Sequence, residues 1–213
     1  MRSDRTFRFV PILLLAALAA AVPASGAGIE ITPTVSYRSS DYECTGATDL
    51  VLVAPPCGVG VRSEAEDGEA FGVVAGFEVA PGWAIEVLAN REETELDVEP
   101  LPGFLFLFPP TNADFTVTHL QAGVARTWGG GSVRPFAGIA AGVTRAEAEH
   151  PDQHHVEFDE DAPSASAGGG VKIGFTDRLG LRLEGRVYWV DLPREVGGDF
   201  VETDLGAGLI LRF

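Results

Sequence analysis

The sequence predicts an all-β fold, namely an eight-stranded antiparallel transmembrane β-barrel with short turns at one end and long loops at the other. Beyond residue 27 the chain reads as eight segments in which apolar residues alternate with polar or small ones. This alternation has the period of two that is typical of a strand. The links between the segments alternate between very short and longer, as they do in transmembrane barrels. The last segment keeps its alternation up to the C-terminal residue, Phe213.

The first half of the chain supplies four of the expected strands, over residues 28–40, 69–80, 83–93 and 114–128. Each of the first three has an apolar row opposite a row of polar or small residues, and Pro81-Gly82 predicts a tight turn between the second and the third. The three apolar rows are Ile29, Ile31, Pro33, Val35 and Tyr37; Phe71, Val73, Ala75, Phe77 and Val79; and Trp83, Ile85 and Val87.

The second half supplies strands over residues 132–147, 164–176, 179–191 and 201–213. Short turns are expected at residues 129–131 and 177–178. The seventh strand places Leu183 and Trp189 on its apolar face, opposite Arg182 and Glu184. The apolar face of the closing strand is Val201, Thr203, Leu205, Ala207, Leu209, Leu211 and Phe213.

Both ends of the chain indicate export. Three arginines precede an apolar run over residues 10–22, and small residues follow, so the sequence predicts a signal peptide over residues 1–27. The apolar run is shorter than the roughly 20 residues that a spanning helix needs, and a buried N-terminal helix is the alternative. The barrel domain is then expected over residues 28–213. The barrel-assembly machinery recognises a last strand that ends on an aromatic residue. Phe213 ends such a strand here.

The chain is strongly acidic, with 15 basic and 31 acidic residues and a net charge of −16. Without the predicted signal peptide, 12 basic and 30 acidic residues remain, which is a net charge of −18. Such a charge argues against nucleic acid as a partner. Thirteen of the acids gather over residues 64–69, 92–99 and 157–161, which we expect to be solvated loops.

Aromatic side chains gather at both ends of the expected strands. Those at the short-turn end are Trp83, Trp128, Phe175 and Phe213, and those at the long-loop end are Tyr37, Phe71, Phe115 and Trp189. Two such girdles are typical of transmembrane barrels, because aromatic rings are stable at membrane interfaces. A soluble barrel such as a lipocalin is the alternative. It would turn its apolar face inward and would not need two aromatic belts.

Three stretches of the second half resemble a known family: residues 133–143 (VRPFAGIAAGV), residues 168–186 (GGGVKIGFTDRLGLRLEGR) and the terminal strand. They are similar to OmpA/OmpX-type small barrels, and more closely to the broad, porin-like family of outer-membrane β-barrel domain proteins. The resemblance implies a monomer without a cofactor in the outer membrane of a Gram-negative bacterium, with short periplasmic turns and long external loops. It implies outer-membrane lipids, lipopolysaccharide, the assembly machinery and periplasmic chaperones as partners. The family hosts many functions, so the fold does not select one.

The inward faces of the expected strands carry six acidic and six basic residues: Glu30, Arg38, Glu78, Glu86, Arg134, Lys172, Arg182, Glu184, Arg186, Glu202, Asp204 and Arg212. Within this set Glu86, Lys172, Arg182, Glu184 and Arg186 are our candidates for a charge network in the lumen. The lumen of an eight-stranded barrel is just wide enough for its own side chains, and unpaired buried charge is costly. We therefore expect a plug of salt bridges, with a proton- or ion-conducting path as the alternative.

The two cysteines, Cys44 and Cys57, both fall in the first long loop. The periplasm is oxidising, so we expect one disulfide between them. Closing a loop of this size contributes about 3 kcal/mol in the chain-entropy model. Two cysteines without nearby histidines would make a weak metal site.

The third long loop holds His150, His154, His155 and Asp159, which are weak candidates for a divalent metal site. Their spacing matches no defined site, so we expect a mobile acidic loop and no metal. A cation bridging this loop to lipopolysaccharide phosphates, or a loop charge sensitive to mild acid, is the alternative.

The second long loop holds Phe104, Phe106 and Phe108 within an apolar stretch over residues 101–110. Apolar side chains in a loop need a partner. We expect them to pack over the barrel mouth or to contact lipid, and a binding site for a hydrophobic ligand is the alternative.

The sequence places no catalytic group. His119 is the only histidine in an expected strand, where it shares a face with Gln121 and Gly123. No Ser-His-acid arrangement follows from the pattern. We therefore expect a non-catalytic surface protein whose loops contact lipopolysaccharide, ligands or other surfaces. The alternatives are a narrow pore or transporter for small hydrophobic molecules and, after that, a lipid-modifying enzyme.

Overall fold

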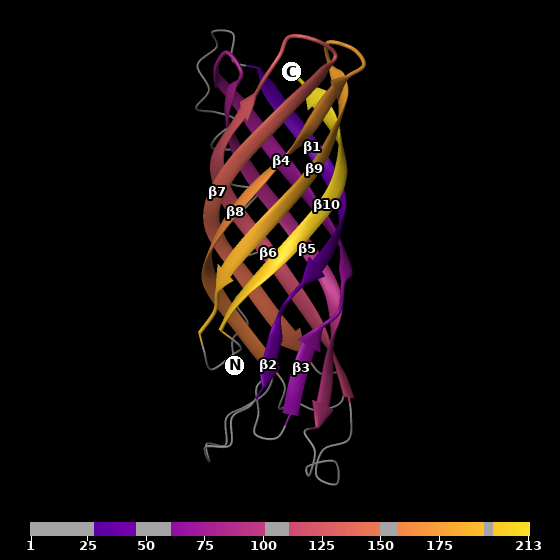
Figure 1. The fold of residues 1–213 in the computed structure, drawn as a ribbon, viewed down its shortest axis with the longest axis vertical. Helices are drawn as coiled ribbons and strands as arrows, with labels where there is room; N and C mark the ends of the chain where they lie inside the picture. The colour runs from indigo at the N-terminus through magenta and orange to yellow at the C-terminus, as the bar shows by residue number, and fades with distance from the viewer. Residues whose placement is uncertain (1–27, 46–60, 101–110, 150–156, 194–197) are drawn as a thin grey trace.

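The computed structural model describes residues 28–45, 61–100, 111–149, 157–193 and 198–213 of the chain. They form a closed eight-stranded antiparallel β-barrel, as the sequence predicts (Figure 1). No helix that could cross a membrane is found among these residues. The strands are β1 (Ile29–Ser40), β2 (Glu43–Thr45), β3 (Val61–Ala65), β4 (Gly68–Ala80), β5 (Trp83–Pro100), β6 (Thr111–Thr127), β7 (Val133–Glu149), β8 (Glu157–Gly174), β9 (Leu179–Asp191) and β10 (Asp199–Arg212).

The barrel wall follows the order β4-β1-β10-β9-β8-β7-β6-β5, and pairing of β5 with β4 closes the ring. The first and last strands are therefore neighbours, with Val35 opposite Ala207. Two short strands that the periodicity did not reveal, β2 and β3, extend the sheet. Strand β3 pairs with the far half of β5, from Val61 opposite Pro100 to Ala65 opposite Leu96.

The short turns β4–β5, β6–β7 and β8–β9 lie at one end of the barrel together with Phe213, and we call this the short-turn end. The opposite end, the long-loop end, carries β2 and β3 (Figure 1). Gly82 and Gly129 occupy the left-handed region, with φ of 71° and 83°, which is where a tight turn favours glycine.

Four strands are longer than the rest. Strands β5 to β8 have 17 or 18 residues each, against 12 to 14 for β1, β4, β9 and β10. The expectation that residues 92–99 and 157–161 are loops is therefore wrong, because both belong to strands. It is also wrong for most of residues 64–69, since 64–65 belong to β3 and 68–69 to β4. The alternation continues there with most acidic residues on the outer face, while Leu96 and Ala162 point inward and are buried. Their charge concealed the strand pattern.

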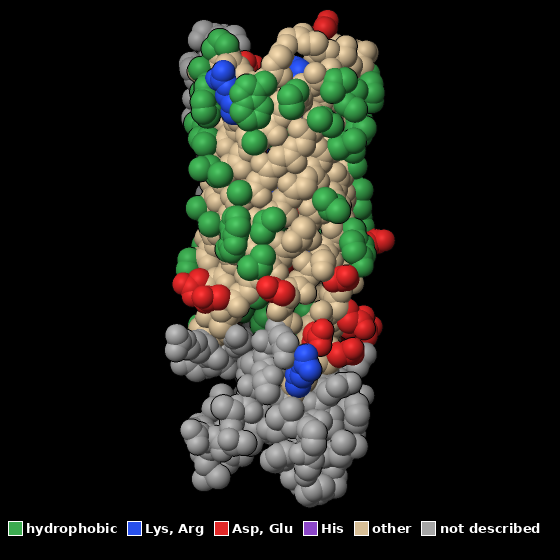
Figure 2. Space-filling view, in the orientation of Figure 1, with side chains coloured by type: hydrophobic (Ala, Val, Ile, Leu, Met, Phe, Trp, Pro, Cys, Tyr) green, Lys and Arg blue, Asp and Glu red, His purple; other side chains and the backbone are tan. Residues whose placement is uncertain are grey.

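The outer face of the barrel is apolar between two aromatic belts. Leu183 and Leu209 point outward, with 40% and 47% of their surface exposed. Seven of the eight predicted girdle residues are exposed at the expected ends. Phe115 is the exception, because it lies at the long-loop end but points inward and is 1% exposed. Figure 2 shows apolar side chains on the barrel body and acidic ones towards the long-loop end.

The inside of the barrel is filled in three layers. From the short-turn end these are a turn-side ion-pair cluster, a His119 cluster and an apolar cluster, defined below. Inward glycines bring neighbouring strands and side chains close together. A Cβ on Gly170, for example, would lie 1.9 Å from the carbonyl oxygen of Leu183, which no real side chain tolerates.

Candidate functional site

The turn-side ion-pair cluster fills the lumen near the short turns. Arg182 donates two hydrogen bonds to the carboxylate of Glu86, at 2.8 and 3.0 Å, and a third to Glu184 at 2.7 Å. Arg186 donates to the other oxygen of Glu184 at 2.6 Å from Nη2. The planar guanidinium group of arginine suits such multiple contacts with carboxylates. Hydrogen bonds between two charged groups are also the strongest kind in proteins.

Lys172 extends this cluster across the barrel. Its Nζ lies 2.5 Å from Glu30 and 3.5 Å from Glu86, and Arg212 contacts the second oxygen of Glu30 at 3.4 Å. The structure thus brings together all five residues of the candidate charge network. It also adds Phe136, whose ring lies 4.3 Å from the Arg182 guanidinium and 5.4 Å from Lys172 Nζ. The sequence analysis did not identify this aromatic partner.

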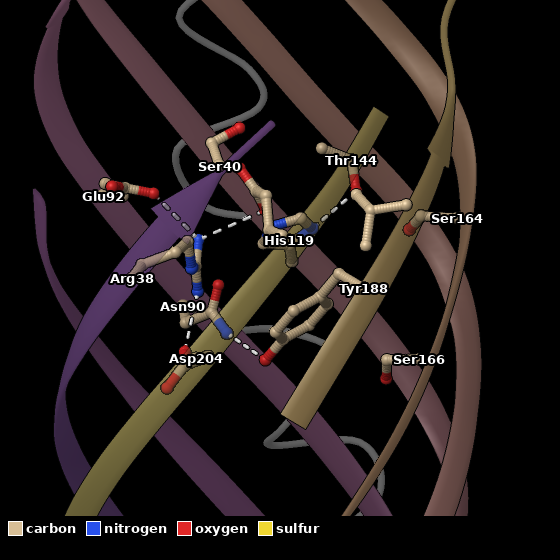
Figure 3. A network of polar contacts seen from close by, with 12 residues as sticks. Arg38, Ser40, Asn90, Glu92, His119, Thr144, Ser164, Ser166, Tyr188 and Asp204 are labelled. Carbon is tan, nitrogen blue, oxygen red and sulfur yellow. Dashed lines mark hydrogen bonds and ion pairs between the residues drawn. The ribbon is translucent and has the colours of Figure 1, made fainter. Parts of the chain in front are cut away.

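The His119 cluster forms the next layer towards the long-loop end. Arg38, on β1, lies 3.4 Å from Glu92 on β5, and 3.7 and 3.1 Å from Glu202 and Asp204 on β10 (Figure 3). Arg38 and Glu202 are completely buried. Glu92 was counted among the loop acids although the expected strand reached residue 93. It points into the barrel because β5 continues past it to Pro100.

His119 lies at the centre of this cluster. Its Nε2 is 2.7 Å from Glu202 Oε2, and its Nδ1 is 2.6 Å from Thr144 Oγ1. Its ring stacks on Tyr188 at 4.4 Å, and Asn90 donates a hydrogen bond to the Tyr188 hydroxyl (Figure 3). The sequence did not reveal these partners. Thr144 is the one partner that the sequence could have indicated. It lies directly opposite His119 in the pairing of β6 with β7, so the register of these two neighbouring strands would identify it.

A polar bridge joins the two clusters. Gln121 exchanges hydrogen bonds with Ser164 and Ser166, at 2.9 and 2.6 Å, and Arg186 donates to the Ser166 hydroxyl at 2.9 Å. A small cavity of about 40 Å³ also lies between the clusters, and Arg186, Tyr188 and other polar groups line it. This volume holds no more than about one or two water molecules.

An apolar cluster closes the long-loop end. Tyr42, just after β1, stacks on Phe115 at 5.4 Å and meets Phe200 edge-on at 5.5 Å. Leu96 and Leu192 are buried in the same cluster, which also contains Ala65, Ala113, Val117, Ala146, Ala148, Ala162 and Val190. The inward position of Phe115 is explained by this packing, which the girdle prediction missed.

The order Thr144, His119, Glu202 is that of a hydroxyl, a base and an orienting acid. All three side chains are essentially buried, however, and none of them lines the cavity described above. The arrangement therefore serves packing and charge balance, and we assign it no catalytic step.

Several predicted site residues lie outside the described residues: Cys57, Phe104, Phe106, Phe108, His150, His154 and His155. Cys44 belongs to β2, opposite Ser63, but its side chain is also outside the described set, so the disulfide stays a prediction. Asp159 is exposed and bonds Arg145. No group of three metal-binding side chains occurs in the described part of the chain.

The outer face of the long strands is acidic. Glu95 and Asp114 face each other across β5 and β6, and Glu93 and Glu147 lie on the same side of the sheet. At the rim, a side-chain hydrogen bond with Asp199 raises the pKa of Asp191, its partner across β9 and β10. Like charges placed this close repel one another, so the outer surface of this end is strongly negative.

Comparison with known proteins supports the fold. The family model described as "Outer membrane protein beta-barrel domain" matches residues 10–213. Neisserial surface protein A is similar in structure, with 16% identity and a TM-score of 0.58 over 90% of this chain and 100% of that one. The outer membrane protein OprG from Pseudomonas aeruginosa shows 13% identity and a TM-score of 0.55 over 88% and 96%. No curated protein matches in sequence. At such identities the likeness concerns the fold alone.

Proposed function

Because this chain belongs to the outer membrane protein β-barrel domain family, we propose that it is a closed, non-catalytic barrel that displays a surface on the outside of the cell. Its long-loop end would contact lipopolysaccharide, ligands or other surfaces. The signal peptide over residues 1–27, the Gram-negative outer membrane, the assembly machinery and the periplasmic chaperones belong to the same proposal.

The filled lumen is the observation that carries this proposal. Two polar layers and one apolar layer follow one another along the barrel axis. The cavity of about 40 Å³ between the polar layers is too small for a hydrated ion or a metabolite. A barrel filled in this way separates its two ends, and its contacts with partners are then made by the surface.

The acidic long-loop end supports the surface role. It extends beyond the outer aromatic belt on strands β5 to β8, where Figure 2 shows acidic side chains. Glu93, Glu95 and Asp114 are exposed there. In the proposed orientation this face lies at the level of the lipopolysaccharide phosphates.

A narrow pore or a transporter for small hydrophobic molecules is the alternative. A groove of about 690 Å³ opens on the lipid-facing side, where Leu183, Gly185 and Leu205 line it. Behind it the β9–β10 ladder is continuous through Glu184 opposite Gly206, so the groove does not reach the lumen. The described wall thus offers no lateral opening that would favour transport.

Single-channel recording of the refolded mature protein in a planar bilayer tests the closed barrel. Folding is checked beforehand by the heat-shifted mobility of the barrel on a gel, and a known porin in the same bilayer is the positive control. We expect no discrete conductance steps, because charged side chains already fill the lumen. Reproducible steps from folded protein would establish the pore instead.

A further inference from the structure

The His119 cluster contains more carboxylates than cations. Arg38 faces the carboxylates of Glu92, Glu202 and Asp204, at 3.4, 3.7 and 3.1 Å. All four side chains are buried, with at most 8% of the residue surface exposed. A buried carboxylate without a compensating positive charge is unstable and tends to take up a proton.

The whole ion-paired interior shows the same imbalance. Among the described interior residues that form ion pairs, the permanent cations are Arg38, Lys172, Arg182, Arg186 and Arg212, and the carboxylates are Glu30, Glu86, Glu92, Glu184, Glu202 and Asp204. There are thus five positive and six negative charges. One proton on His119, which also pairs with Glu202, makes the interior neutral.

The geometry around His119 suits that proton. A charged imidazole donates from both nitrogens. Here Nε2 has Glu202 Oε2 at 2.7 Å and Nδ1 has Thr144 Oγ1 at 2.6 Å, so both donors have an acceptor. The second oxygen of Glu202, Oε1, is buried without a hydrogen-bond partner in the described structure. This carboxylate therefore relies on the charge of His119 and Arg38.

We propose that the His119–Glu202 pair is a proton-binding site, which takes up one proton as the barrel folds at neutral pH and keeps it in the closed state. The site is independent of the surface role proposed above. Because its ligands come from β6 and β10, and its neighbours from β1, β5 and β7, the bound proton joins five strands just beneath the apolar cluster.

The groups that face the pair set its proton affinity. The charged and titratable ones are Arg38 from β1, Glu92 from β5, Tyr188 from β9 and Asp204 from β10. Arg186, also from β9, acts on Tyr188. Strand β7 contributes Thr144, which bonds His119 directly. Ser164 and Ser166 of β8 lie on the other side of Tyr188 (Figure 3). The charges of Glu202 and Asp204 favour the bound proton, whereas burial and the charge of Arg38 oppose it. Within the cluster three carboxylates nevertheless face Arg38, its one permanent cation.

Proton uptake on folding has a defined sign. Above pH 7 the unfolded chain holds a mostly neutral His119 and ionised carboxylates. The folded barrel then binds one proton more than the unfolded chain, so its stability declines as the pH rises. The equilibrium constant for unfolding should rise about tenfold per pH unit until the folded site releases its proton.

Urea unfolding of the refolded barrel in lipid vesicles at pH 7, 8 and 9 tests this site. We expect a tenfold rise per pH unit in the wild type, and a nearly flat profile in Glu202→Gln, because the amide removes the excess carboxylate. Two matched controls should behave as the wild type. They are Glu93→Gln, an exposed carboxylate on β5, and the triple variant of the loop histidines, His150→Gln/His154→Gln/His155→Gln.

Nitrogen-15 spectra of histidine in the wild-type barrel provide a second measurement that needs no variant. At pH 8 we expect His119 to show two protonated ring nitrogens, while the loop histidines are neutral. A neutral His119 together with a pH-independent unfolding constant would overturn the proposal. If Glu202→Gln does not fold, the spectra and the pH profile of the wild-type barrel alone decide whether His119 carries the bound proton.

Discussion

The side chains that matter most in this barrel are charged and buried. Glu86 accepts hydrogen bonds from both terminal nitrogens of Arg182, and its carboxylate lies 3.5 Å from Lys172 Nζ. Only 2% of its surface is exposed. An ion pair of this kind adds little net stability compared with an apolar pair. Breaking it is costly, since the remaining charge is left buried without a partner.

We predict that Glu86→Gln lowers the free energy of unfolding by about 3–5 kcal/mol, because Arg182 and Lys172 lose their shared carboxylate. The matched control is Glu93→Gln, which removes the exposed pair of Arg91 and Glu93 and should cost about 0–1 kcal/mol. Urea titration of both variants in lipid vesicles measures the difference. Equal costs would mean that the lumen charges are hydrated and not paired.

At the scale of the strand, the period of two separates lipid from lumen. Along β9, Leu183 points outward while Arg182 and Glu184 on either side point inward, and β10 repeats this with Leu209. The same alternation continues beyond the outer belt, where the outer face becomes acidic and the inner face becomes apolar.

We predict that Leu183→Arg or Leu209→Arg blocks assembly or costs about 2–4 kcal/mol, because a charge near the bilayer centre is poorly solvated. Thr203→Arg, on the same face of β10 but beside the outer belt, should cost about 0–1 kcal/mol. Folding yield in lipid vesicles, read from gel mobility, checks all three. Wild-type yields for both leucine variants would contradict the assigned faces.

Strand lengths show what the pattern could not reveal at this scale. The bounds of β9 agree with the sequence, because its alternation runs between clear turns. Strand β5 was expected to end seven residues earlier and β8 to begin seven residues later, since Glu95, Asp97 and Asp159 resemble loop residues by composition. A strand outside the membrane has no lipid to face, so its outer side can be charged without losing its pairing.

At the scale of the whole molecule, charge is unevenly distributed. The body of the barrel is apolar, the interior holds nearly balanced charge, and the outer surface of the long-loop end is acidic (Figure 2). Lipopolysaccharide phosphates would be repelled by this surface unless cations lie between them.

We therefore predict that contact with lipopolysaccharide depends on divalent cations. Barrels in phospholipid vesicles should bind added lipopolysaccharide in millimolar Mg²⁺ and release it when EDTA removes the metal. NaCl at the same ionic strength is the control, because screening alone should not replace a bridging ion. The combined variant Glu93→Gln/Glu95→Gln/Asp114→Asn should bind with less dependence on Mg²⁺. Equal binding with and without the metal would contradict this prediction.

The sequence by itself determined the number of barrel strands, the face that most of them turn to the lipid, and the charged character of the lumen. These properties depend on neighbouring residues in one strand, whose alternation is visible in the chain. The tertiary structure decided which lumen charges meet. Arg182 and Glu86 are 96 residues apart, and Arg38 and Asp204 are 166 apart. Their contacts, like the inward turn of Phe115 and the burial of His119, follow from ring closure and strand register, which set the neighbours across the lumen.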